Sequence, residues 1–346
     1  MPAIMEKGTI KTLTTHYIDG AFIESHGRQV MDIIKPTNGQ VIARVTLGDE
    51  EDTRRAIAAA KRAFASFSRT SKEERLLYLR QLHKAVSDHV DDLTAVMIEE
   101  YGGVAQFARL IVESGINAFA AAEKGLLELP LTQSWGKTTV TLEPVGVAGL
   151  ITAWNANALF ICLKLASAVA AGCTVVIKPS EMSSLQTRVM VEALNAAGLP
   201  KGVFNVVTGL GTVVGAELVR NRDVAKISFT GSVTVGEQIM RDGSETMKRV
   251  TLELGGKSPT ILLDDAALDK AIPSALTLAF MNSGPSLRCR NAPSRAEEPA
   301  RRSEAGHTGC DACLHGRRSS RSQRHGWTNG VSEAVRARGI LHSQRH

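Results

Sequence analysis

Strand and helix patterns alternate along residues 145–256, and this alternation restricts the possible folds more than any other feature of the chain. Short runs such as VGVAGLITAW and CTVVIKPS are almost entirely apolar and rich in valine and isoleucine. Segments with apolar residues at helical spacing lie between them, as in SLQTRVMVEALNAAG. Continuous apolar strands are buried on both faces, which requires a parallel sheet covered by helices. The sequence therefore predicts an α/β fold with a doubly wound, Rossmann-like parallel sheet of the nucleotide-binding type.

The segment before this alternation has a different pattern. Residues 16–46 predict short strands separated by turns at Pro36 and Gly39. Two amphipathic helices are predicted over 49–67 and 71–90, and the second begins with the capping-box pair Ser71 and Glu74. The stretch LLELPLTQSWGKTTVTLEP at 126–144 predicts an extended, hairpin-like excursion.

Charge is distributed unevenly along the 346 residues, whose formal net charge is +6. Residues 285–346 hold 12 arginines, no lysine and 5 acidic residues, a balance of +7. Residues 1–284 therefore hold 29 basic and 30 acidic side chains, a balance of −1. The patterned part thus lacks the basic surface that nucleic-acid or membrane-surface binding requires.

Cysteine usage and apolar runs bear on the cellular compartment. Only Cys162 and Cys173 precede residue 285, which predicts a reducing environment without a disulfide framework. The first residues, MPAIMEKGTIKTLTT, contain no apolar core of a secretory signal. The longest apolar stretch is interrupted by Lys164 and is shorter than the roughly 20 residues that span a bilayer. We therefore expect a cytoplasmic protein.

Several polar residues follow the predicted strands, at the edge where a doubly wound sheet binds ligands. Lys178 and Glu181 in KPSE could hold ribose hydroxyls, and the carboxylate would favour NAD over NADP by repelling a 2′-phosphate. A proline turn capped by Ser180 is the alternative. The glycines of TGLGTVVG at 208–215 resemble a dinucleotide fingerprint, but the last gap is one residue too long, so a tight strand–helix turn is preferred.

Three further positions could carry chemistry. FTGSVTVG at 229–236 places the amides from Ser232 onward at a helix start, where an anion binds, although an ordinary helix cap explains the same residues. Glu253 in ELGGKSP could act as a general base or form a strand-end ion pair. Asn155 in AWN could stabilise an oxyanion or serve as a turn residue.

Taken together, ITAWN, AAGCTVVIKPSE, ISFTGSVTVG and LELGGKSP resemble, in order and spacing, the aldehyde dehydrogenase superfamily. The resemblance covers roughly residues 16–284, and ELGGKSP is a specific signature of the family. It implies an NAD-binding domain over 1–252 that includes the excursion at 126–144, through which the family forms homo-oligomers. It also implies the start of a catalytic domain at 253–284. Assembly is in doubt for a chain in which little of that second domain is present.

The resemblance also implies a reaction, the oxidation of a small aldehyde to a carboxylic acid with NAD, NADP being less favoured. A cysteine thiolate attacks the aldehyde, Asn155 stabilises the oxyanion, and Glu253 activates the water that releases the acid. No metal is expected. Ala153 replaces the proline that usually precedes Trp-Asn in the family. The residues implied in cofactor binding are Trp154, Lys178, Ser180, Glu181, Gly211, Thr230, Gly231, Ser232, Val233, Thr234, Val235, Gly236 and Leu254.

The family pattern ends at Gly284. After FMNSG the family continues with Gln, any residue and the catalytic Cys, whereas this chain has Pro285, Ser286 and Leu287. Pro-Ser-Leu-Arg-Cys-Arg can be encoded as CCA AGC CTG CGT TGC CGG. Removal of one C gives CAA GCC TGC GTT GCC GG, which begins Gln-Ala-Cys-Val-Ala. Residues 285–346 are thus expected to be a disordered tail produced by a frameshift, in the gene or in its record.

Alternatives to this interpretation remain. The chain could be an inactive nucleotide-binding remnant or a pseudogene product. Cys289 lies two positions beyond 287, too far along the chain to replace the nucleophile simply. A zinc site formed by His307, Cys310, Cys313 and His315, or non-specific nucleic-acid binding by the arginines, is a weaker interpretation of the tail.

Overall fold

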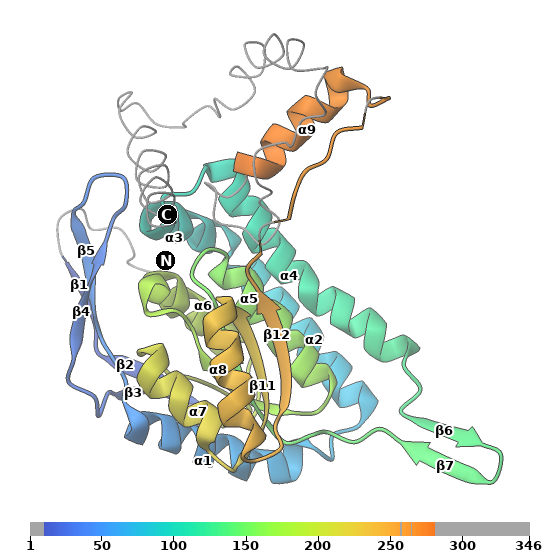
Figure 1. The fold of residues 1–346 in the computed structure, drawn as a ribbon. Coiled ribbons are helices and arrows are strands. Elements are labelled where there is room, and N and C mark those ends of the chain that lie inside the picture. Colours follow the sequence, from blue (N-terminus) through green and yellow to red (C-terminus); the bar gives the residue numbers. More distant parts are fainter. Residues whose placement is uncertain (1–9, 257, 264, 281–346) are drawn as a thin grey trace.

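The computed structural model describes residues 10–280 except 257 and 264. Its centre is a seven-stranded sheet with the order β12-β11-β8-β9-β10-β2-β3 (Figure 1). The first five strands in this order are mutually parallel, and β2 and β3 are antiparallel additions at one edge. The parallel strands are β8 (Val147–Ile151), β9 (Thr174–Lys178), β10 (Phe204–Val206), β11 (Val224–Gly231) and β12 (Arg249–Leu254), and the added strands are β2 (Thr15–Ile18) and β3 (Ala21–Glu24). The predicted doubly wound α/β fold is confirmed.

The chain reverses its direction of travel across the sheet next to β8. From β8 the strands proceed through β9 to β10, and the chain then returns to place β11 and β12 on the other side of β8. A doubly wound sheet opens a crevice at such a reversal, outside the carboxyl ends of the two central strands. By this rule, a ligand site is expected at the carboxyl ends of β8 and β11.

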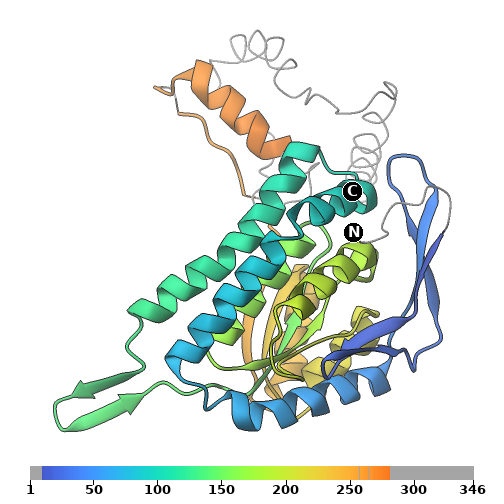
Figure 2. The same ribbon diagram turned by 180° about the vertical axis from the view of Figure 1, so that it is seen from behind.

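Helices cover both faces of the sheet, as the opposite views in Figures 1 and 2 show. One face packs on α1 (Glu50–Phe67), α7 (Ala216–Arg220) and α8 (Val233–Ser244), and the other on α5 (Asn157–Ala170) and α6 (Ser184–Ala196). Beyond α5 and α6 lie α2 (Lys72–Ser87), α3 (Val90–Tyr101) and α4 (Ala105–Glu128). Because side chains alternate along a strand, Val175 and Ile177 enter one apolar core and Val176 enters the other.

Helix α2 begins at the predicted capping box. The Ser71 hydroxyl accepts a hydrogen bond from the Glu74 backbone N–H at 3.1 Å, and the Glu74 carboxylate accepts one from the Ser71 N–H at 2.7 Å. An equivalent reciprocal pair, Asp49 and Asp52, starts α1. The helix that follows the predicted strand–helix turn at 208–215 begins as a π-helical turn, η2 (Gly211–Gly215), and continues as α7.

The remaining elements lie outside the main sheet. A small sheet contains β1 (Lys11–Leu13), β5 (Val41–Thr46) and β4 (Val30–Ile34). Within the predicted excursion, β6 (Thr132–Trp135) and β7 (Thr138–Thr141) form an antiparallel hairpin that projects from the body (Figure 1). The short helix η1 (Glu181–Ser183) precedes α6, and the final described helix is α9 (Leu268–Phe280).

No helix in the described part of the chain combines the length and apolar character that crossing a bilayer requires. Cys162 and Cys173 are both buried free thiols. The positions discussed for the tail, namely Leu287, Cys289, His307, Cys310, Cys313 and His315, lie outside the described residues.

Candidate active site

The carboxyl ends of the parallel strands bring together the residues that the sequence motifs single out. Asn155 follows β8, Lys178 ends β9, and Gly211 follows β10. Thr230 and Gly231 end β11, directly beside Glu253 and Leu254 of β12, with which they pair in register. Segments separated by up to about a hundred residues in sequence thus meet at one edge because all five strands run in the same direction.

Lys178 and Glu181 form an ion pair at the end of β9. The Lys178 ammonium lies 3.1 Å from the Glu181 carboxylate and also donates to the Pro179 carbonyl at 2.9 Å. Burial lowers the pKa of Lys178, and the Glu181 carboxylate partly offsets this effect. Ser180 caps η1, because its hydroxyl accepts from the Met182 N–H at 3.3 Å. The predicted cap at Ser180 is therefore present, and Lys178 and Glu181 lie side by side.

The start of α8 follows β11 directly and is open to solvent. Ser232 is the cap residue, and its hydroxyl accepts from the Val235 N–H at 3.3 Å. Residues 232–235 are exposed, whereas Gly236 is buried. The first N–H groups of a helix have no carbonyl partner within the helix, and the helix dipole favours negative charge there. The turn can therefore accept an anion at the same strand edge as Lys178.

The loop after β8 is held by contacts from two helices. The Trp154 ring packs against Tyr101 of α3, with 5.4 Å between ring centroids. The Trp154 carbonyl accepts from the Ser183 hydroxyl at 3.1 Å. Asn155 follows, half-buried, in the turn that leads into α5. Ala153, where the family usually has proline, therefore lies in a loop that other side chains also fix.

Glu253 is exposed at the end of the edge strand β12, and a buried lysine lies near it. Lys164 of α5 is 8% exposed, and its ammonium donates to the Ser228 hydroxyl of β11 at 2.9 Å. Burial lowers the pKa of Lys164 to about 8, although the Glu253 carboxylate acts in the opposite direction. The position of Lys164 near Glu253 is not evident from the sequence, in which this lysine stands out only as a break in an apolar run. The one feature of the sequence that could have indicated it is a lone lysine on the buried face of the helix that follows β8.

Glu100 is a second buried charged residue near this edge. Its carboxylate accepts from the backbone N–H groups of Leu185 and Gln186 at 2.8 and 3.0 Å, at the start of α6. Burial raises the pKa of Glu100 to about 7, and the two amides act against this rise. A cavity of about 430 Å³ borders Glu100, Tyr101 and Trp154. The hydrogen bonds of Glu100 connect α3 to the segment that carries Glu181. The sequence motifs gave no indication of this residue.

The family model described as "Aldehyde dehydrogenase family" matches residues 22–292. Among curated proteins, 3-succinoylsemialdehyde-pyridine dehydrogenase of Pseudomonas sp. is 40% identical over 285 residues, which are 82% of this chain and 59% of that protein. The NADP-dependent succinate-semialdehyde dehydrogenase GabD of Escherichia coli K12 is 37% identical over 279 residues, 79% of this chain and 58% of GabD.

Among solved structures, a mutant of aldehyde dehydrogenase C from Pseudomonas syringae, in complex with NAD+ and octanal, superposes with a TM-score of 0.83 at 36% identity. That match covers 87% of this chain and 62% of the other. The chain thus spans about three fifths of the length of the relatives that it matches. The family match, the identities and the shared fold agree: this chain belongs to the aldehyde dehydrogenase family.

Proposed function

We propose that the carboxyl edge of the sheet is an NAD site, and that the family reaction carried by the complete fold is the oxidation of an aldehyde to a carboxylic acid. The observation that carries this proposal is the Lys178–Glu181 pair at the end of β9, next to the reversal of strand order. NAD, when bound, supplies the acceptor for the hydride. The aldehyde is a small molecule whose identity depends on a domain that the described residues only begin.

The residues present fit a dinucleotide. Lys178 can donate to ribose hydroxyls and Glu181 can accept from them, while the open first turn of α8 suits a pyrophosphate. A carboxylate beside the ribose repels a 2′-phosphate, which favours NAD over NADP. One relative is NADP-dependent and a neighbouring structure contains NAD+, so the family includes both cofactors. The other residues of the proposed site are Trp154, Ser180, Gly211, the segment 230–236 and Leu254.

In this proposal Asn155 and Glu253 perform the chemistry on the substrate. The Asn155 amide donates to the oxyanion that forms when the aldehyde carbon becomes tetrahedral. Glu253 takes a proton from the water that releases the acid. Lys164 is buried near Glu253, and the Glu253 carboxylate opposes the lowering of the Lys164 pKa by burial. This proposal is supported by the position of both residues at the same edge of the sheet, where Asn155 follows β8 and Glu253 lies near the end of β12, with β11 between the two strands.

The chain as written is proposed to lack this activity, because Leu287 stands where the family places its cysteine. It would then be a nucleotide-binding remnant, and neither nucleic acid nor a membrane surface is a proposed partner. The family's homo-oligomer would use the β6–β7 hairpin, whose residues are all exposed, including Trp135 at 71%. Zinc binding in the tail is not part of the proposal.

Replacement of Glu181 by alanine tests the cofactor assignment. We expect Glu181→Ala to weaken NAD binding by about tenfold, because a hydrogen bond to a charged group contributes about 1.5–3 kcal/mol. NADP binding should fall much less, since the repulsion of its 2′-phosphate is removed as well. Titration calorimetry of the purified chain with both cofactors measures the two effects.

Glu192→Ala is the matched control for this experiment. Glu192 pairs with Arg188 on α6 as Glu181 pairs with Lys178, but it lies away from the strand ends. We expect this variant to leave both affinities unchanged. Equal losses of NAD and NADP affinity in Glu181→Ala would contradict the assignment of Glu181 to the ribose.

A further inference from the structure

A buried chain of polar side chains joins β2, the segment after β3 and α1, outside the residues assigned above. The His16 Nε2 atom lies 3.0 Å from the Ser25 hydroxyl, which lies 3.1 Å from the Asp52 carboxylate. The same Nε2 atom is 3.7 Å from that carboxylate. None of the three residues is more than 4% exposed. Burying polar side chains costs free energy unless their hydrogen-bonding groups all have partners. The burial of these three residues at this place in the fold therefore needs a reason.

The direction of the hydrogen bonds follows from Asp52. Its carboxylate also accepts from the backbone N–H groups of His26, Gly27 and Asp49 at 2.9, 3.1 and 3.3 Å. A carboxylate oxygen accepts hydrogen bonds, and a serine hydroxyl can both donate one and accept one. The Ser25 hydroxyl therefore donates to Asp52, and its oxygen accepts from a neutral His16 protonated at Nε2. The three residues form one directed chain that ends on a buried charge.

This chain supports the segment that leads to the proposed cofactor site. Gly48 lies directly against His16, because a Cβ atom added there would come within 2.7 Å of His16 Nε2. The Gly48 N–H donates to the Thr208 carbonyl at 2.8 Å. A Cβ atom added at Gly209 would in turn come within 2.7 Å of the Gly48 carbonyl oxygen. The imidazole thus contacts Gly48, and Gly48 contacts the 208–211 loop that enters η2.

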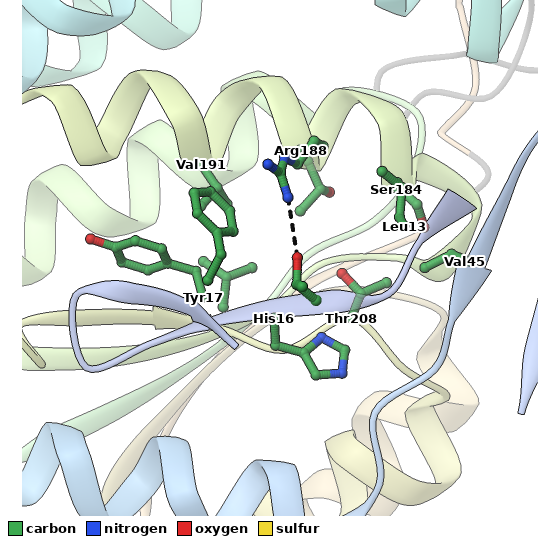
Figure 3. Close-up of a pocket in the computed structure, with 12 residues that line it drawn as sticks. Leu13, His16, Tyr17, Val45, Ser184, Arg188, Val191 and Thr208 are labelled. Carbon is green, nitrogen blue, oxygen red and sulfur yellow. Dashed lines mark hydrogen bonds between the residues drawn. The ribbon is translucent and has the colours of Figure 1, made fainter. Parts of the chain in front are cut away.

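Figure 3 shows the imidazole on the side of β2 that faces away from Arg188, with Thr208 beside it. His16 and Thr208 line a cavity of about 30 Å³ between β2, β10 and α6, enough for a water molecule. On the opposite side of β2, Arg188 donates to the Thr15 hydroxyl at 3.1 Å. The loop therefore rests on a strand that is fixed from both sides.

We propose that His16 is a positioning residue for the dinucleotide, which holds the 208–211 loop through Gly48 and makes cofactor affinity depend on its protonation. This inference rests on the proposed NAD site. The neutral imidazole donates to Ser25 and keeps Gly48 against Thr208. The imidazolium is drawn toward the Asp52 carboxylate, so it loses the position against which Gly48 packs.

The charges around His16 set the pH range of this effect. The carboxylates that face it are Asp52 and Asp49 of the α1 start and Glu24 of β3, and His26 pairs with Asp49. Burial lowers the pKa of His16 below 6.5 in spite of these carboxylates. The folded protein therefore keeps His16 neutral above pH 6.5 and protonates it only at lower pH. NAD affinity should be constant above this value and should fall as the pH decreases below it.

Calorimetry of NAD binding from about pH 7.5 down to the lowest pH at which the chain stays folded tests the inference. We expect the wild-type chain to lose about fivefold in affinity over this range, at the low end of ordinary coupling between sites. His16→Gln can donate to Ser25 but cannot be protonated, so its affinity should match the wild type at pH 7.5 and stay constant. His26→Gln, an exposed histidine of the same region, should retain the wild-type profile. Identical pH profiles for His16→Gln and the wild type would overturn the inference.

Amide hydrogen exchange provides a test that needs no cofactor. If His16 holds the loop, exchange at residues 209–211 should speed up in the wild type below pH 6.5, after correction for the intrinsic pH dependence, and not in His16→Gln. Unchanged protection in the wild type would overturn the inference even if NAD binds. Absence of NAD binding at pH 7.5 would instead contradict the proposed function, and the exchange data would still decide the role of His16.

Discussion

Buried charged side chains lie near this edge of the sheet, and Lys164 is the most informative of them. Its ammonium donates a hydrogen bond to a neutral group, the Ser228 hydroxyl, at 2.9 Å. Its electrostatic interaction with the Glu253 carboxylate acts over a longer distance. Partial compensation of this kind leaves a buried lysine with a depressed pKa. The sequence could not reveal this, because Ser228 and Glu253 come from strands far along the chain. By contrast, Lys178 and Glu181 are close in sequence, and their pairing could be predicted from the motif.

We expect the depressed pKa of Lys164 to appear in the pH dependence of stability. Burial lowers this pKa from 10.5 to about 8, so between these values the unfolded chain binds a proton that the folded chain has released. The contribution of Lys164 to the free energy of unfolding therefore rises with pH in this window. Lys164→Met removes the rise, so from about pH 8 to 9.5 the variant should lose about 1–2 kcal/mol relative to the wild type.

Urea unfolding at the two pH values measures this difference. Lys124→Met is the control, because Lys124 lies on the exposed face of α4 and is 78% exposed at its side chain. That variant should follow the wild-type pH dependence. If the free energy of unfolding changes with pH in the same way in the Lys164 and Lys124 variants, the pKa of Lys164 is not lowered by burial.

At the scale of elements, local sequence patterns predicted those helices, strands and caps that depend on interactions between residues close in sequence. The alternation of apolar strands and helices, the hairpin at 132–141 and the capping box of α2 are all present. The pairing of β2 with β10 was not predicted, because it joins residues nearly two hundred positions apart, as in the pairing of Tyr17 with Val206. The π-helical start of α7 was also missed. Sequence pattern carries no information on which strand edge remains available for pairing.

The capping box at the start of α2 should contribute measurably to stability. Ser71→Ala leaves the Glu74 N–H without its side-chain acceptor, so we expect a loss of about 1 kcal/mol in the free energy of unfolding. Ser87→Ala, at the other end of the same helix, removes only a bond to the His83 carbonyl and should cost clearly less. Chemical denaturation of the three proteins compares them. Equal effects of the two substitutions would show that the capping pair is not stabilising.

At the scale of the whole molecule, the fold contains a complete doubly wound sheet but only part of what its relatives contain. The described residues carry the proposed dinucleotide site, the proposed oxyanion donor Asn155 and the proposed base Glu253. The position that should hold the nucleophile, residue 287, follows the described part and is leucine. The sequence alone predicted the strand-end residues because the family motifs are contiguous. It could not identify the aldehyde, since substrate contacts come from segments beyond those motifs.

Removal of one base in codon 285 is the most direct test of the proposal that a frameshift after Gly284 separates this chain from an active aldehyde dehydrogenase. The restored frame should encode Gln-Ala-Cys at 285–287 and continue past position 346 with strand and helix patterns. Its product should form NADH with simple aldehydes, whereas the present chain should be slower by a factor on the order of 10⁶, as expected for loss of a nucleophile that acts with its partners. Replacement of Glu253 by glutamine should abolish turnover of the restored enzyme. An early stop codon in the shifted frame, or a full-length product that binds NAD without oxidising any aldehyde, would contradict the account.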